Sequence, residues 1–430
     1  MKHLLIVSYP FPPNASAGAV RSERFACYLA KLGWKIDVIT IKPRRDLFED
    51  KDRLNNFEKN VIIHFTTIFD PWLYLRDKRP ENLIVRAIRS VLMRLFSFPD
   101  HMLLWMPFAL KKALSIYKKN RFDAIYTTSP PHSTHLIGLL LSKLTGKPWV
   151  ADFRDPWTLN AYRGKGKIEN ILLWIEKKLE KAVLKNSDLL LANTKANRTN
   201  LLKAFPEIPH GKIVHMPNSW ENFSITATDT KNSNDAPFTI VHAGNFYPRF
   251  KPYALLYALS AWRNDIKYNS TVLPSAKNIK VILIGAKDAA LKNLINDLGL
   301  ADIVKIIPWT ALEKARGIMV KADMLWATLG TGKDSSTYVP SKLFEYIAAK
   351  KPILGFFPKG EAASLIHETG TGTVFTEDNP EPIINFLKQA ILSKQNQNVE
   401  LFVPNYETIN KYNIESIAYK FGKLLETIIE

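Results

Sequence analysis

The stretch Tyr338–Gly355, YVPSKLFEYIAAKKPILG, decides the fold of this chain. Pro340 fixes φ at the position where a helix can begin, directly after a polar loop that contains glycine. The apolar residues that follow recur at helical spacing, and a short strand pattern comes after a brief break. The stretch therefore predicts a helix, Pro340–Ala349, followed at once by a strand, Ile353–Phe357.

The same alternation of strand and helix patterns runs along the whole chain, which indicates parallel sheets with helical crossovers. One series of strands is expected at Leu4–Ser8, Lys35–Thr40, Val61–Phe65, Ala124–Thr128, Trp149–Phe153 and Leu189–Asn193. The other is expected at Thr239–Ala243, Val281–Gly285, Val304–Ile307, Met324–Thr328, Ile353–Phe357 and Gly372–Phe375. Helical patterns lie between them, at Ala19–Lys31, Leu83–Phe96, Pro107–Lys118, Thr134–Leu144, Ile168–Lys185, Ala196–Ala204, Tyr253–Trp262, Ala289–Leu298, Leu312–Lys321 and Pro380–Lys394, and a last one follows at Ile414–Ile429.

The length of 430 residues predicts two or more domains, since single cores stop growing at roughly 250–300 residues. Residues 223–237 are polar and nearly free of large aliphatic side chains, which is typical of a linker. We therefore expect an N-terminal domain over 1–222, a linker over 223–237 and a C-terminal domain over 238–405. Residues 406–430 follow as a final helical segment.

The composition indicates which kinds of partner the protein binds and in which cellular compartment it works. A net charge of +19 favours an anionic partner, whether nucleic acid, anionic lipid or a phosphorylated small molecule. The single cysteine, Cys27, permits no disulfide within the chain, which fits a reducing cytoplasm. The apolar run after Met1 is too short for the core of a signal peptide, and no uncharged apolar run approaches the ~18–20 residues that span a bilayer.

The start of the helix expected at Pro340 is suited to phosphate. Free backbone N–H groups and the positive end of the helix dipole would point at a ligand above the sheet. Ser341 and Lys342 lie in the first turn, where they can hold phosphate oxygens, and Glu345 lies one turn later, where it can accept hydrogen bonds from ribose hydroxyls. The alternative is a capped surface helix on which Lys342 and Glu345 are solvated.

The order of these residues resembles the nucleotide-sugar signature of retaining glycosyltransferases of the GT-B fold, family 4, in the subset that builds bacterial envelope polysaccharides. The resemblance covers nearly the whole chain. It implies two Rossmann-like doubly wound domains that face each other across a cleft, with the C-terminal helix crossing back to the first domain. It implies transfer of a hexose from a nucleoside diphosphate sugar to an acceptor hydroxyl with retention, the acceptor being a saccharide or lipid-linked saccharide held by the first domain. No metal and no other cofactor is expected.

The loop after the first strand, Tyr9–Ala19, contains one glycine, Gly18, that would let the backbone approach a ligand at a helix N-terminus. The loop has neither the G-x-G-x-x-G pattern of dinucleotide-binding oxidoreductases nor the G-x-x-x-x-G-K-[ST] pattern of nucleotide triphosphatases. In family 4 this loop usually carries two glycines and faces the donor phosphates or the acceptor. Gly18 is therefore assigned to donor binding.

The segment Trp149–Trp157, WVADFRDPW, places Asp152, Arg154 and Asp155 at the end of a buried strand. Charges at the edge of a core need partners, so a structural ion-pair cluster is one interpretation. In family 4 this strand end often carries a histidine near the transferred sugar, and Arg154 stands in its place. Because arginine is too basic to shuttle a proton, we expect Arg154 to clamp the leaving diphosphate while Asp152 or Asp155 orients a hydroxyl.

Two histidines, His132 and His135, lie between a strand and a helix. No H-E-x-x-H pattern or third ligand accompanies them, so a metal site is rejected. They are either incidental residues beside a helix start or contacts to the acceptor.

The second domain opens with Ile240–Pro252, in which a strand ends at Gly244 and a basic loop follows. Arg249 and Lys251 suit a diphosphate, whose charge must be met when bound and when leaving. Family 4 has an arginine directly after the glycine, where this chain has Asn245, so Arg249 is expected to supply that charge. A solvated basic loop is the alternative.

Family 4 also has two glutamates eight residues apart. Glu345 matches the second of them, and Thr337 stands at the first. The first glutamate often contacts the sugar, so Thr337 bears on the choice of donor.

Residues 82–119 are a candidate surface for anionic membranes. From Arg76 to Lys119 the chain carries ten Lys or Arg against three acids, and the apolar residues of the expected helix lie opposite its arginines. An amphipathic helix packed on the sheet has the same pattern, and the two interpretations stay open. A cytoplasmic protein, peripheral on the inner face of the cell membrane, is the corresponding location.

Three other functions remain open. A GT-B sugar-nucleotide epimerase shares the fold and would act without an acceptor. A non-catalytic nucleotide-sugar-binding protein is suggested by Thr337, Asn245 and Arg154. A nucleic-acid-binding protein is suggested by the charge, but no nucleic-acid module is recognised and aromatic residues are not interleaved with the basic clusters, so we expect no nucleic acid partner.

Overall fold

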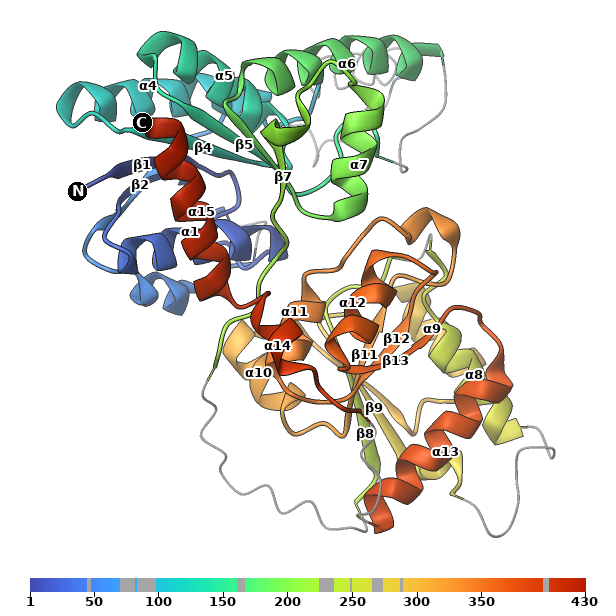
Figure 1. The fold of residues 1–430 in the computed structure, drawn as a ribbon. Helices are drawn as coiled ribbons and strands as arrows, with labels where there is room; N and C mark the ends of the chain where they lie inside the picture. Colours follow the sequence, from blue (N-terminus) through green and yellow to red (C-terminus); the bar gives the residue numbers. More distant parts are fainter. Residues whose placement is uncertain are drawn as a thin grey trace. The chain divides into compact units, whose positions relative to one another are not determined.

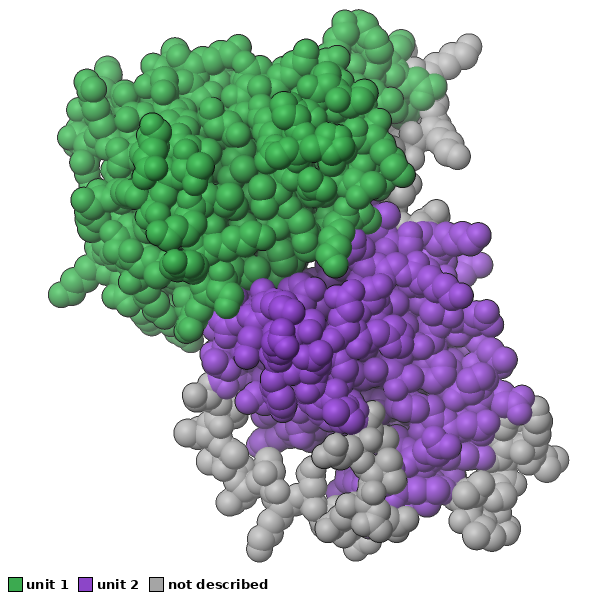
Figure 2. Space-filling view, viewed as in Figure 1, with its two compact units in different colours: residues 1–218, 414–430 green, residues 219–413 purple. Residues whose placement is uncertain are grey.

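A computed structural model describes residues 1–44, 48–69, 82, 98–160, 167–223, 236–247, 250–264, 274–286, 289–396 and 402–430. The chain forms two compact units (Figure 2), the first made of Met1–Asn218 with Ile414–Glu430 and the second of Ser219–Asn413. Most of the expected linker, 224–235, and the expected helix Leu83–Phe96 lie outside the described residues.

The first unit is built on a seven-stranded sheet in which every described pair of neighbouring strands is parallel. Its order, β3-β2-β1-β4-β5-β6-β7, is that of a doubly wound fold, with the strand order reversing between β1 and β4. The strands are β1 (His3–Val7), β2 (Lys35–Ile41), β3 (Val61–Thr66), β4 (Ala124–Ser129), β5 (Trp149–Phe153), β6 (Leu189–Ala192) and β7 (Ile213–His215). The short edge strand β7 was not predicted.

Helices cover both faces of this sheet (Figure 1). They are α1 (Ala17–Lys31), α4 (Met106–Lys119), α5 (Ser133–Thr145), α6 (Lys167–Asn186), α7 (Lys195–Ala204) and α15 (Ile414–Ile429). Successive side chains of a strand point to opposite faces, so Leu4 and Ile6 of β1 share a core with α1 and α15. Leu5 and Val7 share the other core with α4 and α5.

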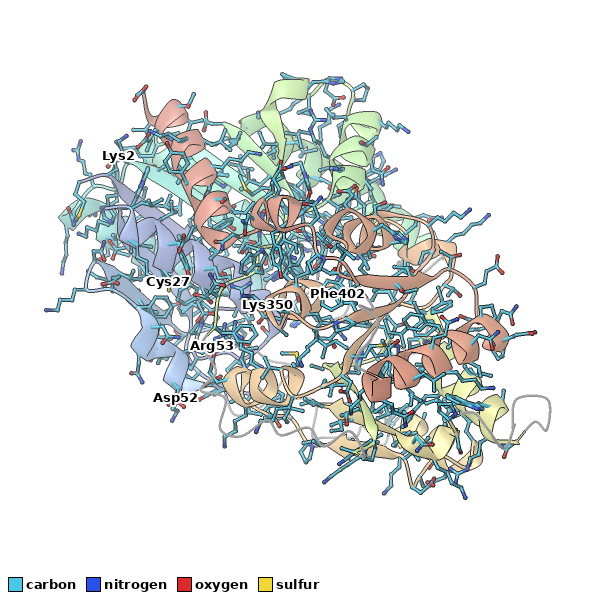
Figure 3. All side chains as sticks on the ribbon, turned by 60° about the horizontal axis from the view of Figure 1, so that its bottom comes forward. Lys2, Cys27, Asp52, Arg53, Lys350 and Phe402 are labelled. Atoms are coloured by element: carbon cyan, nitrogen blue, oxygen red, sulfur yellow. The ribbon has the colours of Figure 1, made fainter. Side chains whose placement is uncertain are left out.

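The C-terminal helix α15 returns to the first unit, as expected, and lies beside α1 (Figure 1). Its apolar residues recur every three or four positions, and the ring of Phe421 lies 4.7 Å from that of Phe25 and 5.4 Å from that of Tyr126. Cys27, on α1, is buried (Figure 3). The last helix therefore completes a core that the N-terminal segment begins.

The second unit has a six-stranded sheet, again parallel at every described pair, with the order β10-β9-β8-β11-β12-β13. The order reverses between β8 and β11. The strands are β8 (Phe238–Ala243), β9 (Ile279–Ile284), β10 (Val304–Ile307), β11 (Met324–Thr328), β12 (Ile353–Phe356) and β13 (Gly372–Phe375). The helices are α8 (Ala254–Asn264), α9 (Ala289–Asp297), α10 (Leu312–Met319), α11 (Lys342–Ala348), α12 (Glu361–Thr369), α13 (Pro380–Asn396) and α14 (Tyr406–Asn410).

The two units together have the α/β architecture that the pattern predicted, with a GT-B type pair of Rossmann-like sheets. Short 3-10 helices add to the connections, at Lys51–Asn56, Leu103–Trp105, His210–Lys212, Ala276–Asn278 and Lys333–Ser335. In doubly wound folds, ligands bind beyond the carboxyl ends of the strands where the strand order reverses. Candidate site residues are therefore those that follow β1, β4 and β5 in the first unit, and β8 and β11 in the second.

Candidate functional site

In the second unit, the loop after β8 and the start of α11 meet where the strand order reverses. Gly244 follows β8 with φ of 105°, a conformation that residues with a side chain rarely adopt. A Cβ atom on Gly244 would lie 3.4 Å from the Nζ atom of Lys342. Because this is an ordinary contact distance, the positive φ, and not a lack of space, favours glycine at this position.

Lys342 donates to a buried histidine. Its Nζ lies 3.0 Å from Nε2 of His242, on β8, and 3.4 Å from the backbone oxygen of Asn245. The other ring nitrogen of His242, Nδ1, lies 2.8 Å from the backbone oxygen of Trp326. Burial lowers the pKa of Lys342 to about 7. Burial, followed by the charge of Lys342, lowers the pKa of His242 well below its usual range, so the imidazole is neutral.

Tyr346 fixes α11 to the same two strands. Its hydroxyl accepts a hydrogen bond from the backbone N–H of Ala243 at 2.8 Å and donates to the backbone oxygen of Trp326 at 3.3 Å. Because Tyr346 is one turn after Lys342 on the helix, this anchor also determines where Lys342 can reach.

Glu345 is held by an arginine that the sequence did not reveal. Arg316, on α10, donates from Nε to Oε2 of Glu345 at 3.0 Å, and its Nη1 donates to Glu313 at 2.6 Å. The side chain of Glu345 is 12% exposed, and that of Arg316 is 6% exposed. Glu345 is therefore an oriented carboxylate and not a solvated one, while its predicted contact with ribose stays a prediction.

The other residues of this unit predicted to bind the donor are Ser341, Lys251, Thr337 and Arg249. Helix α11 begins at Lys342, two residues later than expected, and the Ser341 side chain makes no capping hydrogen bond. Lys251 is exposed. Thr337 is half-buried in the loop before α11. Arg249 lies outside the described residues.

The loops after β8 and β11 are in close contact at Gly330. A Cβ atom there would lie 1.7 Å from the backbone oxygen of Phe250, and φ of Gly330 is 70°. This contact joins the segment that carries Lys251 to the segment that leads into α11.

In the first unit, Asp152 lies inside a buried network. Its oxygens accept two hydrogen bonds from Arg21, at 2.8 and 2.9 Å, one from Tyr126 at 2.6 Å and one from Thr128 at 3.0 Å. The residue is 0% exposed. Arg21 also donates to the backbone oxygens of residues 216 and 217, at 2.8 and 2.7 Å.

This network corrects the prediction for Asp152. A carboxylate with no exposed atom, already holding four donors, cannot orient a substrate hydroxyl without breaking a buried ion pair. The structural ion pair that the sequence left open is present, with Arg21 and not Arg154 as the partner. Nothing in the sequence marked Arg21, because α1 and β5 are far apart along the chain.

Arg154 also contacts α1, at the first turn of the helix. Its Nη1 donates to the backbone oxygen of Gly18 at 2.7 Å, and a Cβ atom on Gly18 would lie 2.6 Å from that nitrogen. Asp155, with a side chain 39% exposed, lies 3.7 Å from Nε of Arg154. The structure thus brings Gly18, Arg154 and Asp155 together.

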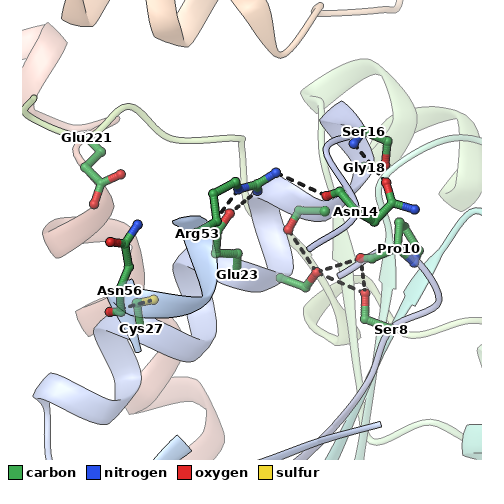
Figure 4. Close-up of polar contacts among 12 residues, drawn as sticks. Ser8, Pro10, Asn14, Ser16, Gly18, Glu23, Cys27, Arg53, Asn56 and Glu221 are labelled. Atoms are coloured by element: carbon green, nitrogen blue, oxygen red, sulfur yellow. Dashed lines mark hydrogen bonds and ion pairs between the residues drawn. The ribbon is translucent and has the colours of Figure 1, made fainter. Parts of the chain in front are cut away.

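Further contacts fix the loop after β1 next to this cluster (Figure 4). The hydroxyls of Ser8 and Ser22 lie 2.9 Å apart, and that of Ser8 donates to the backbone oxygen of Pro10 at 2.9 Å. Arg53 pairs with Glu23 on α1 and donates to the backbone oxygen of Asn14 at 3.1 Å. The loop is therefore held by side chains of α1 and of the segment after β2.

The two histidines differ. His135 is 0% exposed, and its Nδ1 lies 2.8 Å from the hydroxyl of Thr127, which itself accepts from Trp149 at 2.8 Å. Burial lowers the pKa of His135 to about 3, so it is a neutral core residue, and the acceptor contact predicted for it is wrong. His132 is partly exposed and stacks on Trp157 with ring centres 5.0 Å apart, which leaves the prediction of acceptor contact open for that residue alone.

Within the described ranges, no group of three or more His, Cys, Asp or Glu side chains is arranged to hold a metal ion. In the same part of the chain, no helix combines the length and the apolar character needed to cross a bilayer.

Residues 18–219 match the family Glycosyltransferase Family 4. Comparison with curated protein sequences gives no match. Solved structures that are similar over their whole length include a sucrose-phosphate synthase from Thermosynechococcus elongatus, with 14% identity, TM-score 0.65 and coverage of 100% of this chain and 99% of that chain. Anabaena HepE in complex with UDP and glucose has 14% identity, TM-score 0.62 and coverage of 99% of this chain and 100% of that chain.

A third similar structure is WaaG, a glycosyltransferase involved in lipopolysaccharide biosynthesis, with 13% identity, TM-score 0.60 and coverage of 98% of this chain and 99% of that chain. At such identities the likeness to solved structures establishes the fold. Residues 18–219 are therefore similar to Glycosyltransferase Family 4, and the similar solved structures show a GT-B fold over both units.

Proposed function

We propose that the protein is a glycosyltransferase that moves a hexose from a nucleoside diphosphate sugar to an acceptor hydroxyl with retention of configuration. The Family 4 match and the GT-B fold support glycosyl transfer. The observation that carries the donor assignment is the ammonium of Lys342, held by a neutral histidine beside Gly244 where the strand order reverses. This place and this charge suit a diphosphate.

We assign the remaining donor contacts by their positions. Ser341, Lys251 and Arg249 would add donors or charge to the diphosphate, and Glu345 would accept hydrogen bonds from the ribose. One similar structure, Anabaena HepE, is a complex with UDP-glucose, which supports a uridine diphosphate sugar as the first donor to test. No metal or other cofactor is part of this proposal.

The first unit would hold the acceptor. Arg154 would stabilise the charge of the leaving diphosphate, and Asp155 would orient a hydroxyl. A lipid-linked saccharide of a bacterial envelope polymer is the proposed acceptor. Two similar structures support that class: WaaG, which is involved in lipopolysaccharide biosynthesis, and WaaB, a lipopolysaccharide outer core galactosyltransferase.

The test is a thermal-shift screen against UDP, GDP, CDP, dTDP and ADP with the wild type, Lys342→Met and Glu345→Ala. A ligand that binds the native state stabilises it, so one diphosphate should raise the melting temperature of the wild type and fail to do so in both variants. Lys314→Met, an exposed lysine of α10 in the same unit, is the control. A wild type that no nucleotide stabilises would overturn the donor assignment. Sugar release or isomerisation without acceptor would favour the epimerase.

We further propose that the first unit binds anionic membranes on the cytoplasmic side. Of the predicted surface 82–119, residues 83–97 lie outside the described range, and α4 lies within it. Three helices that contact one another in series, α4, α5 and α6, support the proposal (Figure 1). Their exposed large apolar side chains are Phe108, Leu140, Leu144, Ile171 and Trp174.

The charge of these helices is suited to anionic headgroups. The sequences of α4 and α5 contain lysine and no acid. On α6, Glu176 and Glu180 are buried and accept hydrogen bonds from Trp157 and Thr158. Glu169 of this helix is half-buried, against exposed lysines that include Lys177, Lys178 and Lys181. Exposed lysines beside an exposed tryptophan are typical of an interfacial surface.

Flotation with phosphatidylcholine vesicles, with and without phosphatidylglycerol, tests this surface. Trp174→Ser should reduce binding to the anionic vesicles. Tyr406→Ser, which removes an equally exposed ring from the second unit, should not; both side chains belong to residues that are 58% exposed. Equal binding by both variants and the wild type would exclude this surface.

A further inference from the structure

We propose that His242 is a positioning residue for the donor, which holds the ammonium of Lys342 in place for a diphosphate without neutralising it. The inference rests on the proposed function and adds to it a residue that no motif marked. Three contacts carry it: the histidine's bond to Trp326, its bond to Lys342, and the packing of its ring.

The tautomer of His242 follows from its partners. A backbone oxygen can only accept, so Nδ1, 2.8 Å from the oxygen of Trp326, carries the hydrogen and donates. Nε2 then carries a lone pair, and at 3.0 Å from Lys342 Nζ it accepts. The ring cannot turn over without losing both bonds.

Packing keeps the ring in this orientation. His242 is 0% exposed. Its ring stacks on that of Phe246 with centres 4.0 Å apart and planes 10° from parallel, and the ring of Trp326 lies 5.4 Å away. The acceptor for Lys342 is therefore built into the end of β8 and does not depend on a mobile side chain.

A neutral acceptor has a consequence that a carboxylate would not have. An ammonium has three N–H donors, and His242 takes one of them while leaving the positive charge uncancelled. The ion pairs of the described residues include none for Lys342. The backbone oxygen of Asn245, at 3.4 Å, takes a second donor. The third donor and the uncancelled charge are available to phosphate oxygens, where charge-assisted hydrogen bonds are strong.

The other ionisable groups on the packed elements are either engaged elsewhere or exposed. On α11, Glu345 is paired with Arg316, and Tyr346 is bonded to the backbone of Ala243 and Trp326. On α10, Glu313 is paired with the same arginine. Lys251, in the loop after β8, is exposed. The state of Lys342 therefore depends chiefly on burial and on its histidine partner.

The pH dependence of donor binding follows with a definite sign. The diphosphate binds the protonated lysine, and the pKa of Lys342 in the free protein is about 7. Affinity should be constant below that pH and fall by up to tenfold per pH unit above it. Without the acceptor, the ammonium is less stabilised, so in a variant that lacks it the fall should begin at a lower pH.

The experiment measures the Kd of UDP-glucose by calorimetry from pH 5.5 to 9, since this probe has no phosphate that titrates near pH 7. Four proteins are compared: wild type, His242→Phe, Lys342→Met and the double variant. His242→Phe keeps a ring of similar shape and removes both hydrogen bonds. We expect it to weaken binding about tenfold at pH 8, or about 1.4 kcal/mol, and to shift the pH profile to lower values. In the double variant, the histidine change should add nothing to Lys342→Met.

Two controls separate a positioning role from a structural one. His242→Gln, whose amide can accept from Lys342, should restore most of the affinity. The melting temperature of each free variant reports loss of fold. If His242→Phe weakens binding equally with and without Lys342, or leaves the pH profile unchanged, the inference is wrong. If the wild type does not bind UDP-glucose or any of the five diphosphates, the proposed function itself has failed.

Discussion

Replacing Asp152 with asparagine separates the two roles that the sequence left open for this residue. In the structure, Asp152 and Arg21 are buried together, with side chains 0% and 4% exposed. Asparagine keeps the volume of the side chain and an acceptor for Tyr126 or Thr128, and it removes the charge. The guanidinium of Arg21 is then left inside the unit with neutral partners only.

We expect Asp152→Asn to lower the stability of the first unit strongly. Removing one partner of a buried ion pair typically destabilises a protein by about 3–5 kcal/mol. For a unit of this size, each kcal/mol lowers the melting temperature by about 2–4 °C, so we expect a fall of roughly 6–20 °C. Differential scanning calorimetry resolves the transition of the first unit if the two units unfold separately, and intrinsic fluorescence in urea provides a second measurement.

Asp155→Asn is the matched control, because it makes the same chemical change three residues later on an exposed side chain. Asp155 is paired with Arg154 at 3.7 Å, and such pairs contribute up to about 1 kcal/mol, so the melting temperature of Asp155→Asn should fall by no more than about 4 °C. A variant Asp152→Asn that melts like the wild type and yet loses transferase activity would refute the reasoning and return Asp152 to the catalytic residues.

Three further predictions follow from buried contacts. Burial acts to raise the pKa of Asp37, but hydrogen bonds from two histidines outweigh it and hold that pKa well below its usual range. The free energy of unfolding should therefore fall as the pH drops below about 4. Urea unfolding from pH 3 to 6 tests this, and the midpoint should fall less in Asp37→Asn than in the wild type. Gly330→Ala should lower the free energy of unfolding more than Gly33→Ala, because both glycines have positive φ but only Gly330 faces a backbone oxygen. The left-handed conformation alone costs roughly 1–2 kcal/mol. Equal losses of stability in denaturant unfolding would contradict the predicted clash. Arg316→Met should weaken binding of UDP-glucose, because Glu345 loses the partner that orients it; an unchanged Kd would show that this carboxylate does not contact the ligand.

Local patterns were enough for most of the fold. The helix Ile414–Ile429 and the strands Trp149–Phe153, Val304–Ile307, Met324–Thr328 and Gly372–Phe375 have the predicted bounds. Helix Glu361–Thr369 and the three-residue edge strand β7 were missed, since short elements carry few turns of periodicity.

Part of the candidate site could likewise be predicted from local patterns. The sequence by itself placed Lys342, Glu345 and Gly244 near one another, because the carboxyl ends of parallel strands and the helices that follow them meet at one edge of a sheet. It also placed Arg154 and Asp155 at such an edge. These inferences need only the order of elements and the direction of the strands.

Only the tertiary structure decided which charged group is buried and which faces a ligand. Asp152 and Asp155 lie three residues apart, and one holds Arg21 inside the unit while the other is exposed. Lys342 and His242 are 100 residues apart, and no spacing along the chain predicts their contact. A side chain's partner is set by packing between distant segments, so the local pattern that determines helices and strands carries no information about it.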